Sequence, residues 1–160
     1  MISESTPGIA AERSAADLVG RLRRLPDSQA RLQLVVDLAR TRPELPDALR
    51  TDAHRVPGCL VRLWFVGTLR DGRCWFGTDS DAVSLKALVG LLCDLNSGLR
   101  PEEIGPGPAA VLEELGLLRQ LAESRRATVL RVAATMRAIA AGAKPMESAD
   151  PCVIAARETR

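Results

Sequence analysis

The spacing of apolar residues predicts two helices at the start of the chain. Leucines recur at helical intervals over residues 18–25, and Pro26, which cannot continue a helix, ends the pattern. A second helical pattern covers residues 29–40 and follows Asp27, a residue type that commonly caps a helix N-terminus. Three prolines fall within residues 43–57, where no regular period is visible, so we expect an irregular wrapping segment that leads into a loop.

A change to a period of two indicates a β-hairpin. Apolar residues alternate over 61–69, and the return strand covers 74–78. The Asp-Gly pair at 71–72 is a strong signal for a two-residue turn, which pairs Leu69 with Cys74. Both faces of this hairpin are largely apolar, so we expect other elements to cover both. One face carries Leu63, Phe65, Leu69, Cys74 and Phe76, and the other carries Trp64, Val66 and Trp75.

Helical periodicity returns after the hairpin. We expect helices over residues 82–95 and 109–115, a single helical turn at 101–103, and a last helix that Ser124 caps and that runs to about residue 141. Helices on both sides of one hairpin predict an α+β fold, in which helices flank a small antiparallel sheet.

The length of 160 residues allows one domain with one core. We place this domain at residues 15–142. Residues 1–14 are expected to form a flexible N-terminal tail, and residues 143–160, which hold two prolines and scattered charge, a C-terminal tail.

The composition excludes several classes of protein. Lys and Arg number 22 against 20 Asp and Glu, and this net charge of +2, without a basic tract or an aromatic stacking platform, argues against a nucleic-acid partner. The longest apolar runs, such as residues 87–92, are too short to span a membrane. Residues 1–13 have neither the basic nor the apolar region of a signal peptide. We therefore expect a cytoplasmic protein without a membrane partner.

The cysteines indicate single-thiol chemistry. The chain has four, Cys59, Cys74, Cys93 and Cys152, which are too few and too scattered for a disulfide framework in a chain of this length. No pair has the Cys-x-x-Cys spacing of a zinc ribbon or a thioredoxin-type site. Cys74 falls on an apolar face of the hairpin and Cys93 on the apolar stripe of a helix, so we assign both to the core. Cys152 falls in the expected C-terminal tail and is interpreted as a bystander.

The stretch from His54 to Cys59 carries the clearest candidate chemistry. The Pro-Gly pair before Cys59 favours a turn, which places the thiol at or near a loop tip. Arg55, Arg62 and His54 lie close by in the sequence, and positive neighbours favour the thiolate, the nucleophilic form of cysteine. Such a thiol suits attack on an electrophilic sulfur or ligation of a metal. The residues alone are equally compatible with a small buried cysteine in a turn.

Several short motifs follow one another in a fixed order along the chain. They are Val56-Pro57-Gly58-Cys59, a strand with Trp64, Gly77-Thr78-Asp79-Ser80-Asp81-Ala82, Asn96-Ser97-Gly98-Leu99, Pro101-Glu102-Glu103-Ile104, Ser124-Arg125-Arg126 and Met136-Arg137-Ala138-Ile139. In this order and spacing the motifs resemble the SufE/CsdE family, the sulfur-acceptor partners of cysteine desulfurases in iron–sulfur cluster assembly. The resemblance covers roughly residues 15–142.

The resemblance implies a transient persulfide carrier. Proteins of this family accept a sulfane sulfur from the persulfide of a cysteine desulfurase on one loop cysteine, which the motif puts at Cys59. They stimulate the desulfurase and pass the sulfur to a cluster scaffold. The PLP cofactor belongs to the desulfurase, so the chain is expected to bind no cofactor and no metal of its own. The family fold is α+β with a three-stranded antiparallel sheet, whose first strand would lie near residues 54–56.

The resemblance also implies that a small set of residues near the thiol loop and at the start of the last helix contacts the desulfurase. They are His54, Arg55, Asp79, Asp81 and Arg125. Two other interpretations stay open: His54 as a hydrogen-bonding loop residue, and Asp79 and Asp81 as caps of the helix that follows them. Arg131 and Arg137 are assigned to the exposed face of the last helix.

One departure from the family pattern lies beside the candidate thiol. Leu60-Val61 replace the usual Gln-Ser, so apolar side chains stand where polar ones would surround the cysteine. Two other functions stay open. In the first, the chain is a metal-binding or cluster-scaffold protein in which Cys59, His54 and an acidic residue such as Asp79 hold zinc or iron. In the second, it is a non-catalytic adaptor whose cysteine is incidental.

Overall fold

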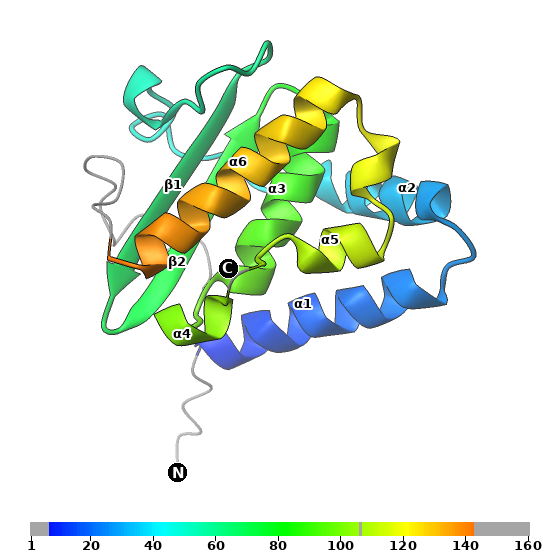
Figure 1. Cartoon of the computed structure of the whole chain (residues 1–160), viewed down its shortest axis with the longest axis horizontal. Helices are drawn as coiled ribbons and strands as arrows, with labels where there is room; N and C mark the ends of the chain where they lie inside the picture. The colour runs from blue at the N-terminus through cyan, green and yellow to red at the C-terminus, as the bar shows by residue number, and fades with distance from the viewer. Residues whose placement is uncertain (1–6, 106, 143–160) are drawn as a thin grey trace.

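The computed structural model describes residues 7–105 and 107–142, with side chains from residue 15 onward. The expected C-terminal tail at 143–160, with Cys152, lies outside the described residues. Helices precede and follow one hairpin, so the predicted α+β fold is confirmed (Figure 1). The elements are α1 (Pro7–Arg24), α2 (Ser28–Ala39), the 3₁₀ turn η1 (Asp52–His54), β1 (Leu63–Arg70), β2 (Arg73–Ser80), α3 (Val83–Asn96), α4 (Pro101–Ile104), α5 (Ala110–Glu114), the 3₁₀ turn η2 (Leu118–Gln120) and α6 (Glu123–Ala140).

The strands β1 and β2 form an antiparallel hairpin in the predicted register, with Leu69 opposite Cys74. The turn residues Asp71 and Gly72 both have positive φ angles, 52° and 75°. Such angles belong to the two-residue turn whose twist matches that of the flanking strands, and Asp-Gly is one of its preferred sequences. The turn therefore fixes which side chains share a face.

Both faces of the hairpin are covered, as predicted. On one face Phe65 and Phe76 stack with ring centroids 5.8 Å apart and enter the main core, which α3 and α6 cover. On the other face Trp64 packs against Leu45 and Leu49, from the irregular segment between α2 and η1. This wrapping segment closes a second, smaller core.

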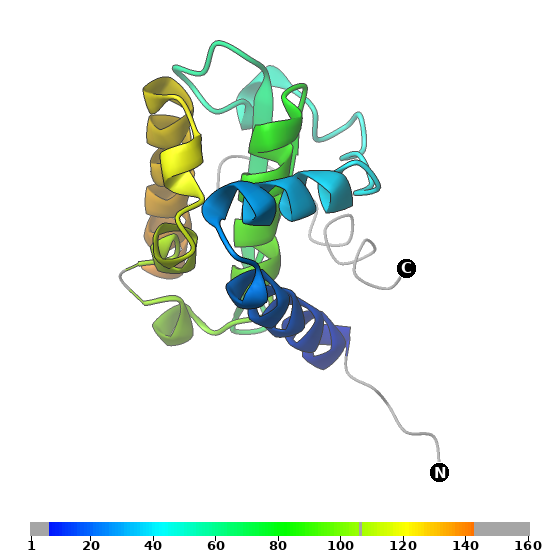
Figure 2. The same cartoon turned by 90° about the vertical axis from the view of Figure 1, so that its right-hand side faces the viewer.

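The helix α3 lies at the centre of the fold. It packs on β2 and contacts α1, α2 and α6, which surround it in Figure 2. Residues 87–93 are all buried, so the helix is apolar around its circumference rather than along one stripe. None of the described helices combines the length and the apolarity needed to cross a membrane.

The third strand expected from the family resemblance is reduced to a single bridge. Arg55 pairs with Trp64, and the Val56 N–H donates to the backbone of β1 at 2.8 Å. The pairing stops there because Pro57 has no N–H to donate and Gly58 turns the chain with a φ of 78°. The sheet in the described part of the chain therefore has two strands.

Three helix starts differ from the prediction. The helix α1 begins at Pro7, within residues 1–14 that the apolar pattern assigns to a tail. Proline suits a first helical turn, because the N–H that it lacks would be unpaired there. Ala82 and Ala122 occupy the N-cap positions of α3 and α6, and neither makes a side-chain cap hydrogen bond. Ser124 therefore lies inside α6 and does not cap it.

Candidate functional site

Residues 57–62 form a loop between the β-bridge and β1, which we call the Cys59 loop. The Cys59 side chain is half-buried and packs against the main core, whereas the next residue, Leu60, is 94% exposed. Gly58, with its φ of 78°, turns the chain between the β-bridge and these two residues. The loop therefore holds the thiol at the edge of the core and directs one apolar side chain into solvent.

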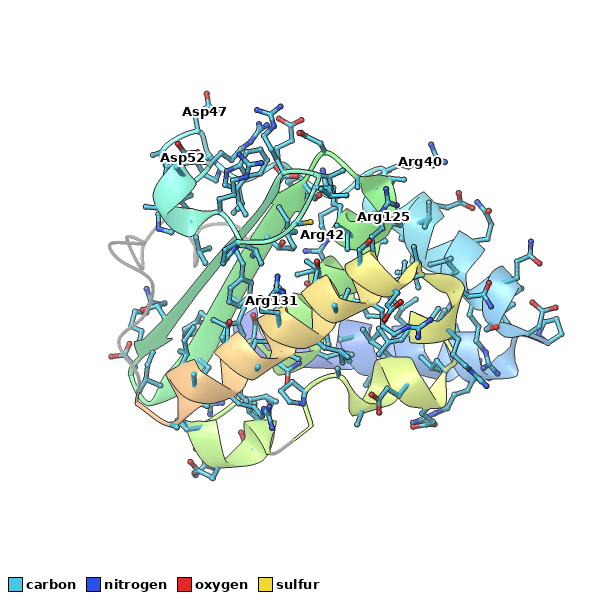
Figure 3. The ribbon with its side chains drawn as sticks, turned by 45° about the horizontal axis from the view of Figure 1, so that its top comes forward. Arg40, Arg42, Asp47, Asp52, Arg125 and Arg131 are labelled. Carbon is cyan, nitrogen blue, oxygen red and sulfur yellow. The ribbon has the colours of Figure 1, made fainter. Side chains whose placement is uncertain are left out.

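Arg131, which extends from α6 (Figure 3), connects this helix to the Cys59 loop. The guanidinium Nη1 donates a hydrogen bond to the Pro57 carbonyl at 2.6 Å. It also lies so close to Gly58 that a Cβ on that residue would be 2.9 Å from Nη1. The predicted exposure of Arg131 is confirmed. Its contact with Pro57 is not predictable from the sequence, because the two partners are 74 positions apart and no local pattern links them.

Two arginines lie over Trp64 beside the loop. The Cζ atoms of Arg50 and Arg62 are 4.9 Å and 5.4 Å from the ring centroid, within the range of cation–π contacts. Arg62 also pairs with the exposed Asp81 at 2.6 Å. Arg55 is exposed as well. The predicted basic surroundings of the loop are therefore present, with Arg131 making the direct contact with its backbone.

Asp79 is a buried anchor. Its carboxylate accepts hydrogen bonds from the N–H groups of Leu45 at 2.9 Å and Ser80 at 2.8 Å. Lys86 Nζ lies 3.4 Å from Oδ1, and Arg50 Nε lies 4.0 Å from Oδ2. The residue is 3% exposed, so direct contact with a partner would require it to leave this position. The prediction that it caps α3 is wrong, because its oxygens instead tie β2 to the wrapping segment.

The other predicted contact residues differ in exposure. His54 is 3% exposed, and its Nδ1 lies 3.1 Å from Thr51 Oγ1, so its ring is part of the η1 turn. Arg125, in the first turn of α6, is half-buried and donates to Ser84 Oγ at 2.8 Å, at the start of α3. Near the loop the structure thus leaves two of the five predicted contact residues exposed, Arg55 and Asp81.

The other two described cysteines lie in the core, as predicted. Cys74 is 0% exposed and Cys93 is 1% exposed. Burial, together with the nearby Glu102 carboxylate, raises the pKa of the Cys74 thiol. In the described part of the chain, Cys59 is therefore the one thiol that reaches the surface.

The metal-binding alternative gains no support from the described residues. Among them, no three His, Cys, Asp or Glu side chains come together in a group that could hold a metal ion. The oxygens of Asp79, the acidic ligand suggested for that alternative, already accept hydrogen bonds from two backbone N–H groups.

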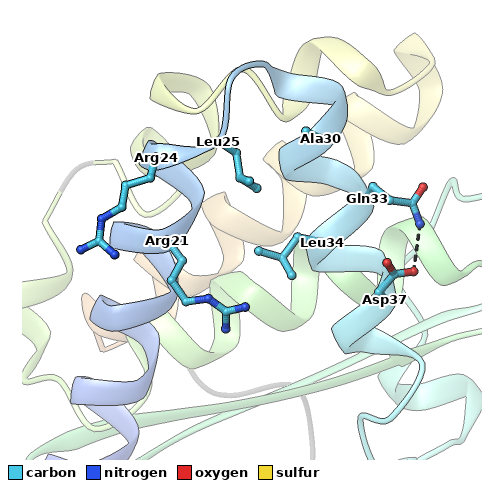
Figure 4. A pocket seen from close by; sticks show the side chains of 7 residues that line it. All are labelled: Arg21, Arg24, Leu25, Ala30, Gln33, Leu34 and Asp37. Carbon is cyan, nitrogen blue, oxygen red and sulfur yellow. Dashed lines mark hydrogen bonds between the residues drawn. The ribbon is translucent and has the colours of Figure 1, made fainter.

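A separate groove lies between α1 and α2 (Figure 4). It has a volume of about 450 Å³, and Arg21, Arg24 and Asp37 supply its charged lining. All of its lining residues come from these two helices and the turn between them, so it is not part of the Cys59 site.

The chain is similar to known proteins over most of its length. A family model described as SufE, Fe-S metabolism associated domain, matches residues 16–140. An uncharacterized SufE-like protein of Rhizobium meliloti is 32% identical over 112 residues, which cover 67% of this chain and 79% of that protein. The sulfur acceptor protein CsdE of Escherichia coli is 34% identical over 95 residues, which cover 58% of this chain and 64% of CsdE.

The fold is also found in a solved structure. The solution structure of a hypothetical protein from Thermus thermophilus superposes with a TM-score of 0.64 at 20% sequence identity, covering 81% of this chain and 94% of that one. This likeness concerns the fold alone. The family model, by contrast, spans the whole core from within α1 to the end of α6, and the chain therefore belongs to the SufE family.

Proposed function

We propose that the chain is a sulfur acceptor of iron–sulfur metabolism that carries a persulfide on Cys59. The observation that carries the proposal is the placement of this thiol, half-buried in a loop between a glycine turn and the fully exposed Leu60. The burial of Cys74 and Cys93 supports the same assignment. So does the similarity to the sulfur acceptor CsdE.

The transfer step is a thiol–persulfide exchange. The Cys59 thiolate attacks the terminal sulfur of a persulfide on the donor, a new S–S bond forms on Cys59, and the donor cysteine leaves as a thiolate when the old S–S bond breaks. The electrons balance without an added oxidant or reductant. The Cys59 thiol must reach the donor, and the persulfide that forms on it must then be shielded from solvent. The packing of Cys59 against the main core supports the second requirement.

The donor in this proposal is a cysteine desulfurase, whose PLP cofactor supplies the C–S bond cleavage. The chain needs no cofactor of its own, because exchange requires only a reachable thiolate. Removal of the persulfide frees the desulfurase for another turnover, so the chain stimulates the enzyme and then passes the sulfur to a cluster scaffold complex. The cytoplasm suits this chemistry because its thiols are kept reduced.

Titration of the chain into a desulfurase with excess L-cysteine tests this function. Alanine production is expected to rise with the concentration of the chain and to saturate, because transfer takes place within a complex. A known SufE-family protein serves as the positive control for each desulfurase in a panel. A flat response with every desulfurase that the control stimulates would contradict the proposal.

Leu60 is expected to bind an apolar pocket on the desulfurase. Its side chain is 94% exposed in the free chain and stands next to the reacting thiol, so partner binding would bury it. Full burial of a leucine contributes about 1.5–3 kcal/mol. Leu60→Gln is therefore expected to raise the half-saturating concentration of the chain by roughly tenfold, with the maximal rate kept.

The matched control for this variant is Leu38→Gln, which changes an exposed leucine on α2 (41% exposed) outside the Cys59 loop. The control is expected to leave the titration curve unchanged. Equal half-saturation for Leu60→Gln and the unmodified chain would show that the partner does not contact this side chain.

A further inference from the structure

Within the Cys59 loop, the backbone of residues 57–61 has one hydrogen bond to the rest of the described structure. Strand-like pairing ends at Val56, and the next backbone group held by a neighbouring element is the Arg62 carbonyl, which accepts from β2 and the residue after it. Among the described residues, only the hydrogen bond from Arg131 to the Pro57 carbonyl holds the backbone of residues 57–61. The position of the loop therefore depends on this hydrogen bond and on the packing of Cys59 and Val61 against the main core.

Arg131 extends from a helix that is firmly fixed. Val129 and Val132, on the opposite side of the same turn, are 0% and 1% exposed in the main core. One turn earlier, Arg126 donates to the carbonyl of Leu118 in η2 at 3.1 Å. The backbone at Arg131 is thus fixed relative to the core, and opening of the loop requires the hydrogen bond between the guanidinium and the Pro57 carbonyl to break.

The guanidinium and the loop fit each other closely. Nη1 is 2.6 Å from the Pro57 carbonyl oxygen, and a Cβ at position 58 would lie 2.9 Å from it. A Cβ at this distance would make the end of the Arg131 side chain shift, so glycine at position 58 leaves room for the hydrogen bond as observed. The positive φ of Gly58 adds a second reason for glycine at the same place.

We propose that Arg131 tethers the Cys59 loop in its half-buried position and thereby sets how often the thiol is presented to a reaction partner. The role of the tether in sulfur transfer rests on the proposed function, since exchange requires Cys59 to leave the core and enter another protein. The tether itself is a property of the free chain. Arg131 is a positioning residue, because its contact is with the loop backbone and not with the reacting sulfur.

Alkylation of Cys59 in the absence of any desulfurase tests the tether. Arg131→Gln is expected to raise the alkylation rate of Cys59 by roughly threefold, the effect of losing one hydrogen bond that is exposed to solvent. Rates are followed by peptide mapping at several pH values. The limiting rate at high pH is compared, because there a change in thiol ionisation no longer contributes.

Cys74 and Cys93 serve as internal reporters of unfolding, because both are buried. Gly58→Ala both crowds the guanidinium and strains the turn through the positive φ at position 58, so it is expected to accelerate Cys59 at least as much. Arg40→Gln, the same chemical change at the C-terminal end of α2, is expected to have no effect.

An unchanged limiting rate for Cys59 in Arg131→Gln would overturn the tether. A parallel rise for Cys74 would also overturn it, since Arg131 would then stabilise the fold as a whole. If Arg131→Gln accelerates the alkylation of Cys59 but the unmodified chain stimulates no desulfurase, the tether is supported and only the proposed function is contradicted.

Discussion

A Cys59→Ser variant is expected to bind a cysteine desulfurase with the affinity of the unmodified chain and to stimulate it at least about 100-fold less. A serine hydroxyl has nearly the shape of the thiol but is hardly ionised at neutral pH, so it cannot displace a thiolate from a persulfide. Because Cys59 is half-buried at the surface of the core, the substitution is expected to cost about 1 kcal/mol or less in folding free energy.

This variant is best measured in competition with the unmodified chain. Binding without transfer makes Cys59→Ser a competitive inhibitor, whose half-inhibiting concentration reports affinity separately from chemistry. Cys152→Ser is the matched control and is expected to keep full stimulation. Stimulation that survives in Cys59→Ser would mean that the chain acts on the desulfurase as an adaptor and not as a carrier.

Asp79→Ala is expected to destabilise the fold by about 3–5 kcal/mol, the usual effect of removing one partner from a buried ion pair. The substitution removes the acceptor for the N–H groups of Leu45 and Ser80. It also leaves Lys86, 3.4 Å from the carboxylate, without this counter-charge. Arg50 Nε, which is buried without a hydrogen bond, loses the Asp79 carboxylate 4.0 Å away.

Unfolding by urea at neutral pH, followed by tryptophan fluorescence, measures this loss. Both tryptophans, Trp64 and Trp75, lie on the hairpin face that the wrapping segment covers, and Asp79 ties this segment to β2. The control is Asp81→Ala, which removes an exposed pair with Arg62 and is expected to cost no more than about 1 kcal/mol. Equal stabilities for the two variants would contradict the anchor role of Asp79.

Features set by neighbouring residues are predictable from the sequence. The Asp-Gly turn and the alternation around it specify the register that pairs Leu69 with Cys74. The start of α2 is predictable because Asp27 is a cap residue, and its carboxylate accepts the Ala30 N–H at 2.8 Å. The turn that brings Cys59 to the surface follows in the same way from the Pro-Gly pair before it.

Features set by distant residues are not predictable from such patterns. Asp79 has the residue type and position of a helix cap, but the Leu45 N–H and the Lys86 ammonium reach it through the tertiary fold and hold it elsewhere. The contact between Arg131 and Pro57 depends on where α6 crosses the hairpin, and arginine on an exposed helix face carries no local sign of it. The position of Cys59 in a turn is therefore predictable from the sequence, but the long-range contacts that hold this turn and Asp79 are not.

The most direct test of Cys59 as the sulfur carrier is to locate the transferred sulfur by mass spectrometry. The chain is incubated with a desulfurase and L-cysteine, alkylated and digested, and the mass of each cysteine-containing peptide is measured. The account predicts one added sulfur atom, removable by a thiol reductant, on the peptide that contains Cys59 and on neither Cys74 nor Cys93. Sulfur bound only at Cys152, or on no cysteine while the desulfurase turns over, would contradict it.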